Sequence, residues 1–189
     1  MYSKLKKKMK NILVVFIFLS SICIAQTTKP VKTFPVVEKA VFESINKYRE
    51  EKGLKKVIWC EKTYQAAYHH SYYLSDMKKI PKIIHKETVD VENFEELVYL
   101  GDRLRKYISH GGSPYGVENI ITNDFDDWWF QRKDIDPIKN YCRCIFGGWK
   151  NSPGHNDGML DKRVTHGAIA IVRELDGDYC RVVMVFCKY

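Results

Sequence analysis

Residues 149–160 read WKNSPGHNDGML, and they are the most informative part of the chain. A tryptophan closes a predicted helix at residues 137–149, and a Ser-Pro-Gly sequence follows shortly after it. Proline and glycine together indicate a turn, and this turn places His155 directly behind Gly154. The histidine is therefore held near a helix end, where it either contacts a ligand or caps the helix and ties down the turn.

Two upstream segments carry comparable information. Residues 116–120 read GVENI and overlap a short predicted strand, in which Glu118 is the charged side chain. Residues 45–49 read INKYR and lie in a first predicted helix, where apolar residues recur at the 3.6-residue spacing of one helix face. Trp59 then precedes a second predicted helix over residues 61–79, which contains two consecutive alanines.

The predicted elements place helices first and a hairpin last. Residues 166–173 are apolar on both faces, which is typical of a strand buried on two sides. Residues 179–186 return as a second strand after an Asp-Gly turn signal. This order predicts an α+β domain, in which helices pack over an antiparallel sheet with a C-terminal β-hairpin. The remaining elements are expected as helices from 37 to a stop at Gly53, at 61–79, 92–107 and 137–149, and as a strand at 117–122.

The order and spacing of these segments resemble the CAP superfamily, which comprises cysteine-rich secretory proteins, antigen 5 and pathogenesis-related 1 proteins and is also known as the SCP-like extracellular domain. The form of the His155 segment is more similar to the bacterial branch than to the animal or plant branches. The resemblance covers about residues 37–186. It implies a three-layer α-β-α sandwich with an open central cleft, and we expect the domain at residues 37–189.

In many members of this family the cleft holds two histidines and two acidic residues. Carried over by motif, the resemblance implies Glu118 and His155 as site residues. It also implies His85 as the first histidine, because His85 lies in the loop after the second predicted helix, and His110 is the alternative. Where many eukaryotic members have a second glutamate, this chain has Ser152, which leaves a His-Glu-His set.

Three kinds of chemistry suit that set. Two neutral imidazoles, His85 and His155, together with a carboxylate can hold a zinc ion and leave a position for water. Without a metal, the two histidines titrate near neutral pH and share a proton network with Glu118. In the third interpretation the set is structural, and Glu118 accepts hydrogen bonds that fix its strand to the next loop.

Three functions are compatible with these interpretations. The resemblance favours a secreted binding or scaffold module, whose His/Glu-lined cleft takes a lipid, glycan or protein ligand. The alternative is a metal-assisted hydrolase or peptidase that uses His85, Glu118 and His155, with water activated by the metal. The missing second glutamate leaves no obvious general base, so an enzyme is the less expected of the two. A structural or adhesive surface protein is the third candidate.

The N-terminal segment has the layout of a secretory signal peptide. Residues 1–10 carry five lysines and no acid, and residues 11–25 are nearly all apolar. Small residues favour cleavage near Ala25. The apolar run is shorter than the roughly 20 residues that span a bilayer, so an uncleaved anchor is less expected, as is lipidation of Cys23 behind the bulky Ile22. We therefore expect a secreted or periplasmic protein without a stable membrane span, in which residues 26–36 are a linker.

Charge and cysteine content narrow the partners further. The signal segment carries five of the 31 basic residues and none of the 23 acids, so the net charge falls from +8 to +3 when it is removed. A surplus of that size does not support nucleic-acid binding. Five cysteines remain, and export makes disulfides expected. Their pairing stays open, except that Cys180 and Cys187 lie seven residues apart in one predicted strand and face opposite sides.

Two further groups of residues are interpreted as structural. His69 and His70 lie in the middle of the second predicted helix among tyrosines, where a histidine is more often a surface or core residue than a ligand. The aromatic cluster at residues 128–130 is expected to pack over the core. Its alternative is an exposed binding patch.

Overall fold

The structure of the protein is a computed structural model that describes residues 31–76, 80, 82–91, 94–108, 115–124, 136–174 and 177–188. In chain order, its elements are β1 (Val31–Thr33), α2 (Pro35–Glu51), β2 (Ile58–Trp59), α3 (Glu61–Leu74), α4 (Leu100–Tyr107), β3 (Gly116–Asp124), α6 (Pro137–Lys150), α7 (Pro153–Met159), β4 (His166–Glu174) and β5 (Tyr179–Cys187).

Strands β4 and β5 form the centre of the sheet, and nearly every one of their residues is buried. The strand order is β1-β4-β5-β3, and each of these pairings is antiparallel. β2 adds a short parallel pairing to β4, in which Ile58 lies opposite His166. The predicted antiparallel sheet with a C-terminal hairpin is therefore confirmed, with one parallel contact added to it.

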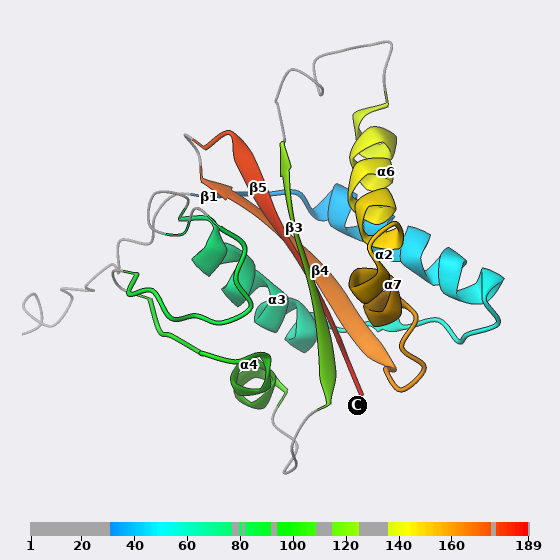
Figure 1. Cartoon of the computed structure of the whole chain (residues 1–189), viewed down its shortest axis with the longest axis horizontal. Coiled ribbons are helices and arrows are strands. Elements are labelled where there is room, and N and C mark those ends of the chain that lie inside the picture. The colour runs from blue at the N-terminus through cyan, green and yellow to red at the C-terminus, as the bar shows by residue number, and fades with distance from the viewer. Residues whose placement is uncertain are drawn as a thin grey trace, which may run out of the picture.

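Helices cover both faces of the sheet (Figure 1). On one face, α2, α6 and α7 enclose a core that includes Val41, Ile45 and Trp149. On the other, α3 and α4 enclose a core that includes Ala67 and Leu104. Burial of apolar side chains on both faces of one sheet is what holds the three layers together. The predicted three-layer α-β-α sandwich is confirmed.

The first helix begins and ends at residues suited to those positions. α2 starts at Pro35, and proline is tolerated there because the first backbone N–H of a helix needs no partner within it. It ends just before Gly53, whose φ of 73° lies in the left-handed region that glycine adopts without strain. The predicted stop at Gly53 is confirmed, and the helix begins two residues earlier than residue 37.

The second helix is shorter than predicted, since α3 ends at Leu74 rather than at residue 79. Side chains bind the carbonyl groups of its last turn. Arg181 Nε donates to the carbonyl oxygen of Leu74 at 3.0 Å, and Ser75 Oγ donates to that of Tyr72 at 2.7 Å. These bonds satisfy acceptors that would otherwise favour a further helical turn.

The helix predicted over residues 92–107 is wrong in its first half, because α4 begins only at Leu100. The backbone before it is bound by side chains instead. The N–H of Leu97 donates to Glu87 Oε2 at 2.7 Å, and the carbonyl of Leu97 accepts from Arg103 at 3.0 Å. The backbone N–H of Glu87 also donates to the Val98 carbonyl at 3.1 Å.

The segment predicted as a linker contributes to the fold. Residues 31–33 form β1 and pair with β4 opposite residues 172–174, and α2 follows from Pro35. The polar composition concealed this strand because pairing at a sheet edge depends on backbone hydrogen bonds rather than on apolar side chains.

The expected disulfides are not formed, since the five cysteines of the described residues are all free thiols. Cys180 belongs to the core under α2 and α6, and Cys187 belongs to the core under α3, so the two face opposite sides as predicted. Cys142 and Cys144 lie on α6 in an outer layer, and Cys60 precedes α3. Cys142 packs against the core that contains Cys180, and Cys60 stands at the start of the helix that covers Cys187.

Several predictions fall outside the described residues: the signal segment at 1–25 with Cys23, residues 26–30, His110 and the aromatic cluster at 128–130. Within the described ranges, the structure holds no helix with the length and apolar character needed to cross a membrane.

Candidate functional site

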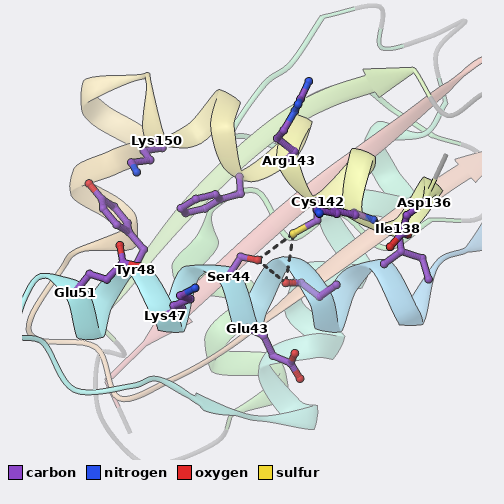
Figure 2. A pocket seen from close by; sticks show the side chains of 13 residues that line it. Glu43, Ser44, Lys47, Tyr48, Glu51, Asp136, Ile138, Cys142, Arg143 and Lys150 are labelled. Atoms are coloured by element: carbon purple, nitrogen blue, oxygen red, sulfur yellow. Dashed lines mark hydrogen bonds between the residues drawn. The ribbon is translucent and has the colours of Figure 1, made fainter.

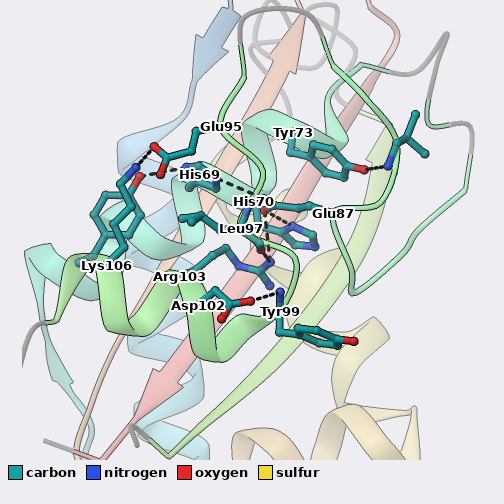
Figure 3. A network of polar contacts seen from close by, with 12 residues as sticks. His69, His70, Tyr73, Glu87, Glu95, Leu97, Tyr99, Asp102, Arg103 and Lys106 are labelled. Atoms are coloured by element: carbon teal, nitrogen blue, oxygen red, sulfur yellow. Dashed lines mark hydrogen bonds and ion pairs between the residues drawn. The ribbon is translucent and has the colours of Figure 1, made fainter. Parts of the chain in front are cut away.

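A histidine pair on α3 faces one buried carboxylate. His70 Nδ1 lies 2.9 Å from Glu87 Oε1, and His69 Nε2 lies 3.2 Å from Glu87 Oε2 (Figure 3). Burial alone would raise the pKa of Glu87. Hydrogen bonds from both imidazoles and from the N–H of Leu97, together with the charge of Arg103, lower that pKa to about 2. Glu87 is therefore a fixed negative charge at the end of the α3 layer.

Arg103 joins this carboxylate to a second one on the sheet. Its side chain is fully buried, and Nη1 donates to Glu87 Oε1 at 3.2 Å while Nη2 donates to Glu118 Oε2 at 2.6 Å. Charge-assisted bonds of this kind are the strong ones, and the planar guanidinium suits two carboxylates at once. Arg103 thus connects α4, the loop around Glu87 and β3.

Glu118 occupies the end of this network that faces the surface. Its side chain is only 3 % exposed, and Oε1 lies 3.0 Å from His85 Nδ1 and 3.8 Å from His70 Nε2. Burial raises its pKa, but His85, His70 and Arg103 together lower it below the usual value. The carboxylate is therefore ionised, and both of its oxygens are engaged.

His85 reaches Glu118 from the loop that follows α3, and its side chain is 58 % exposed. The hydrogen bond to Glu118 raises the pKa of His85, although partial burial acts in the opposite direction. Because Nδ1 is engaged by Glu118, Nε2 is the nitrogen left to contact a ligand. The structure thus brings together two of the residues implied by the family motif.

His155 is held differently. It lies half-buried in α7, and its backbone carbonyl accepts a hydrogen bond from Asn119 Nδ2 at 2.7 Å. Burial, with a contribution from the charge of His85, lowers the pKa of His155. Ser152 is the N-cap residue of α7, and its carbonyl accepts from the N–H of Asn156 at 2.8 Å. The backbone contact to Asn119 fixes α7 against β3, next to Glu118.

The side chains do not fit the zinc ion implied by the resemblance. Both oxygens of Glu118 are bound by Arg103 and His85, so the carboxylate is not available to a cation in this arrangement. In the described part of the chain, no group of three or more His, Cys, Asp or Glu side chains is placed to hold a metal. A catalytic zinc needs three protein ligands, which this arrangement does not supply.

A pocket of about 410 Å³ opens where His85 meets Glu118. Glu118 is the only acid among the described side chains that line it. Tyr99 at its mouth is 54 % exposed, and Lys86 Nζ lies 5.0 Å from the centroid of that ring. The pocket therefore combines hydrogen-bonding groups, an aromatic face and an apolar floor. It is lined by two glycines and by His85, Lys86, Tyr99, Leu100, Leu104 and Glu118.

A second, larger groove of about 700 Å³ lies between α2 and α6 (Figure 2). Cys142 lines it, with Sγ 3.0 Å from Ser44 Oγ. Burial raises the pKa of this thiol, which keeps it protonated and unreactive at neutral pH. The residues implied by the family motif do not line this groove, and we therefore place the candidate site at the His85 pocket.

Sequence reasoning missed Glu87 and treated the α3 histidines as ordinary structural residues. One signal could have identified His70. It lies three residues after Ala67 and four after Ala66, so it falls on the same buried helix face as these small residues. Glu87 carries no such signal, because it lies in a loop without periodicity.

The comparisons with known proteins agree with this fold. The chain resembles an extracellular protein with an SCP domain from Bacillus anthracis, with 21% identity, a TM-score of 0.54, and coverage of 81% of this chain and 40% of that one. It also resembles an outer surface protein of Borrelia burgdorferi, with 15% identity, a TM-score of 0.59, and coverage of 85% and 98%. The match thus spans less than half of the Bacillus protein. No protein of curated function matches the chain.

The family model described as "CAP: Cysteine-rich secretory protein family" matches residues 42–189, which is most of the chain. The antiparallel sheet between two helical layers is consistent with that match. The protein therefore belongs to the CAP family.

Proposed function

We propose that the protein is an exported binding module, and that its pocket at His85 and Glu118 recognises a sugar unit of a glycan. The observation that carries this proposal is the fixed state of Glu118. Arg103 and His85 hold both carboxylate oxygens, at 2.6 and 3.0 Å. A polar group that is already positioned loses little entropy when a ligand arrives, which favours recognition.

The lining of the pocket favours a sugar over a lipid chain. His85 and Lys86 offer polar contacts, and the exposed ring of Tyr99 offers a flat apolar face. Ligand sites of this size combine an apolar surface with a few placed polar groups. A sugar ring has one apolar face and several hydroxyls, so it matches both parts. An acyl chain would offer no partner to the outer nitrogen of His85 or to Lys86.

A hydrolase is less well supported. General acid–base catalysis requires a group that can exchange a proton with the substrate at the working pH. Glu118 is held ionised by its neighbours, and its pKa is lowered rather than raised. No other acid lines the described part of this pocket. His85 alone remains as a titrating group.

Export is the second part of the proposal. The two similar structures come from an extracellular protein and an outer surface protein. Together with the lysine-rich and apolar N-terminal segment, this supports cleavage near Ala25 and a location outside the cytoplasm. Mass spectrometry of exported material is expected to find Gln26 as the first residue. An intact Met1 in that material would exclude cleavage.

The binding proposal is tested by NMR titration of the purified protein with disaccharide-peptide fragments released from bacterial cell wall by a muramidase. We expect the ring signals of His85 and Tyr99 to shift, and H85A and Y99A to weaken binding at least tenfold. Y179A is the matched control. Tyr179 is 45 % exposed, and it lies at the start of β5, which is the end of that strand away from the pocket.

Two results would count against the proposal. If the fragments leave the His85 and Tyr99 signals unchanged, the pocket does not bind this glycan. Binding to phosphatidylglycerol vesicles that is lost in H85A, without any response to the fragments, would replace it with a lipid ligand at the same pocket.

A further inference from the structure

The acid in the pocket contributes little net charge to it. Glu118 is almost fully buried, and the guanidinium of Arg103 lies directly behind it, with Nη2 2.6 Å from Oε2. A cation at that distance in a low-dielectric interior strongly compensates the carboxylate. A ligand at the mouth therefore meets a carboxylate whose charge is already balanced from within the protein.

The two buried carboxylates are engaged from inside the protein. Arg103 lies between Glu87 and Glu118. His70 contacts Glu87 Oε1 through Nδ1 at 2.9 Å and the carbonyl oxygen of Ile84 through Nε2 at 3.0 Å. Both acids therefore have buried partners within the fold.

The charge at the mouth of the pocket is consequently positive. His85 and Lys86 are the exposed polar side chains beside Glu118. Lys86 Nζ lies over the Tyr99 ring, 5.0 Å from its centroid, so the entrance holds a cation in contact with an aromatic ring. An exposed lysine attracts an anion, and the buried Glu118 is the only acid among the described residues that line the pocket.

We propose that the ligand is a sugar bearing a carboxylate, an inference that rests on the glycan-binding function proposed above. The sugar ring packs its apolar face on Tyr99, and its carboxylate lies between Lys86 Nζ and His85 Nε2. A neutral sugar of the same shape makes the first contact and lacks the second, so the pocket discriminates between the two by charge.

Two monosaccharides test this directly. N-acetylmuramic acid and N-acetylglucosamine share a ring and an acetamido group and differ by one lactyl carboxylate. In NMR titrations of the full protein at low ionic strength, we expect the acid to bind at least tenfold more tightly. The preference should shrink as salt is added, since exposed charges are screened.

Substitutions identify the residue that causes the preference for the acidic sugar. K86Q should reduce the ratio of the two affinities to about twofold, because it removes the cation that distinguishes the acid from the neutral sugar. K56Q is the matched control, because Lys56 is an exposed lysine in the segment between α2 and β2, and it should retain the full ratio. Inorganic phosphate serves as a third probe, and it should compete only weakly because it cannot pack on Tyr99.

The outcomes distinguish a failure of the carboxylate proposal from a failure of the glycan-binding proposal. Equal affinity for both sugars, with shifts at His85 and Tyr99, overturns the carboxylate and leaves the glycan site standing. A preference for the acid that survives K86Q also overturns the carboxylate proposal, because the effect would then belong to another site. Phosphate that competes as well as the acid overturns it too, because the pocket would then bind any anion. A lack of response at the pocket to both sugars and to the cell-wall fragments overturns the glycan function itself.

Discussion

Glu38 Oε1 accepts a hydrogen bond from the backbone N–H of Ile171 at 2.9 Å. This bond fills a gap in the sheet, because β2 pairs with β4 at residues 166–167 and β1 pairs with it at 172–174. A helix side chain therefore takes the place of a neighbouring strand between these two pairings. The cost is a buried carboxyl group, and burial raises the pKa of Glu38 to about 7.

Stability should fall as the pH rises through 7. The pKa of Glu38 is higher in the folded state than its usual value of 4.5, so the folded state binds the proton more tightly. The stabilisation is fully present below about pH 4.5 and is lost above pH 7. Between pH 5.5 and pH 8, urea unfolding should show the free energy of unfolding of the wild type falling by about 2 kcal/mol relative to that of E38Q. E43Q, exposed on the same helix, should show no such difference from the wild type.

Removal of the shared cation should destabilise the fold strongly. R103M leaves Glu87 and Glu118 buried without the guanidinium that joins them, and loss of one partner of a buried charge pair costs about 3–5 kcal/mol. Chemical denaturation measures this. R105M is the control, since Arg105 is exposed and its pair with Asp102 should be worth about 1 kcal/mol or less. Equal effects of the two substitutions would contradict the buried-network description.

The asparagine of the first helix should act as a clamp. Asn46 Nδ2 donates to the carbonyl of Val57 at 2.9 Å, and Asn46 Oδ1 accepts from the N–H of Val57 at 2.8 Å. N46A leaves a buried backbone donor and acceptor unpaired, so we expect a loss of about 2–4 kcal/mol. The exposed neighbour on α2, in K47A, should change the unfolding free energy by less than about 0.5 kcal/mol. Similar losses for both would refute the clamp.

Two glycines in α7 should respond oppositely to alanine. A Cβ on Gly158 would lie 2.6 Å from Asn119 Oδ1, so G158A should push α7 away from β3 and disturb the bond between Asn119 and the His155 carbonyl. A Cβ on Gly154 meets no atom within 4 Å, and G154A should stabilise the helix by up to about 1 kcal/mol. Thermal unfolding and the backbone signals of His155 report both. A tolerated G158A would show that the close approach is not required.

Much of the fold could be predicted from the sequence, because local signals and the family motif agree. Apolar periodicity, Gly53 and the alternation in the last two strands identify α2, β4 and β5. The stretch before α4 could not be predicted, because its backbone is bound by Glu87 and Arg103, and neither contact is local. A backbone conformation that is held by side chains from elsewhere in the chain produces no periodicity in its own sequence.

The candidate site, too, could be predicted only in part. The contact between His85 and Glu118 was predicted from the family motif, and the structure brings the two together at 3.0 Å. Glu87 and its bond to His70 were not predicted, because that bond closes between α3 and a loop 17 residues later. The sequence names both residues but does not show that they meet behind the pocket.

The free thiols have a practical consequence. Because the five described cysteines form no bridge, the folded state does not depend on covalent cross-links between distant parts of the chain. The described domain can therefore be produced in a reducing bacterial cytoplasm and purified with dithiothreitol present, with no oxidative refolding step. Its unfolding midpoint should be the same with and without the reductant.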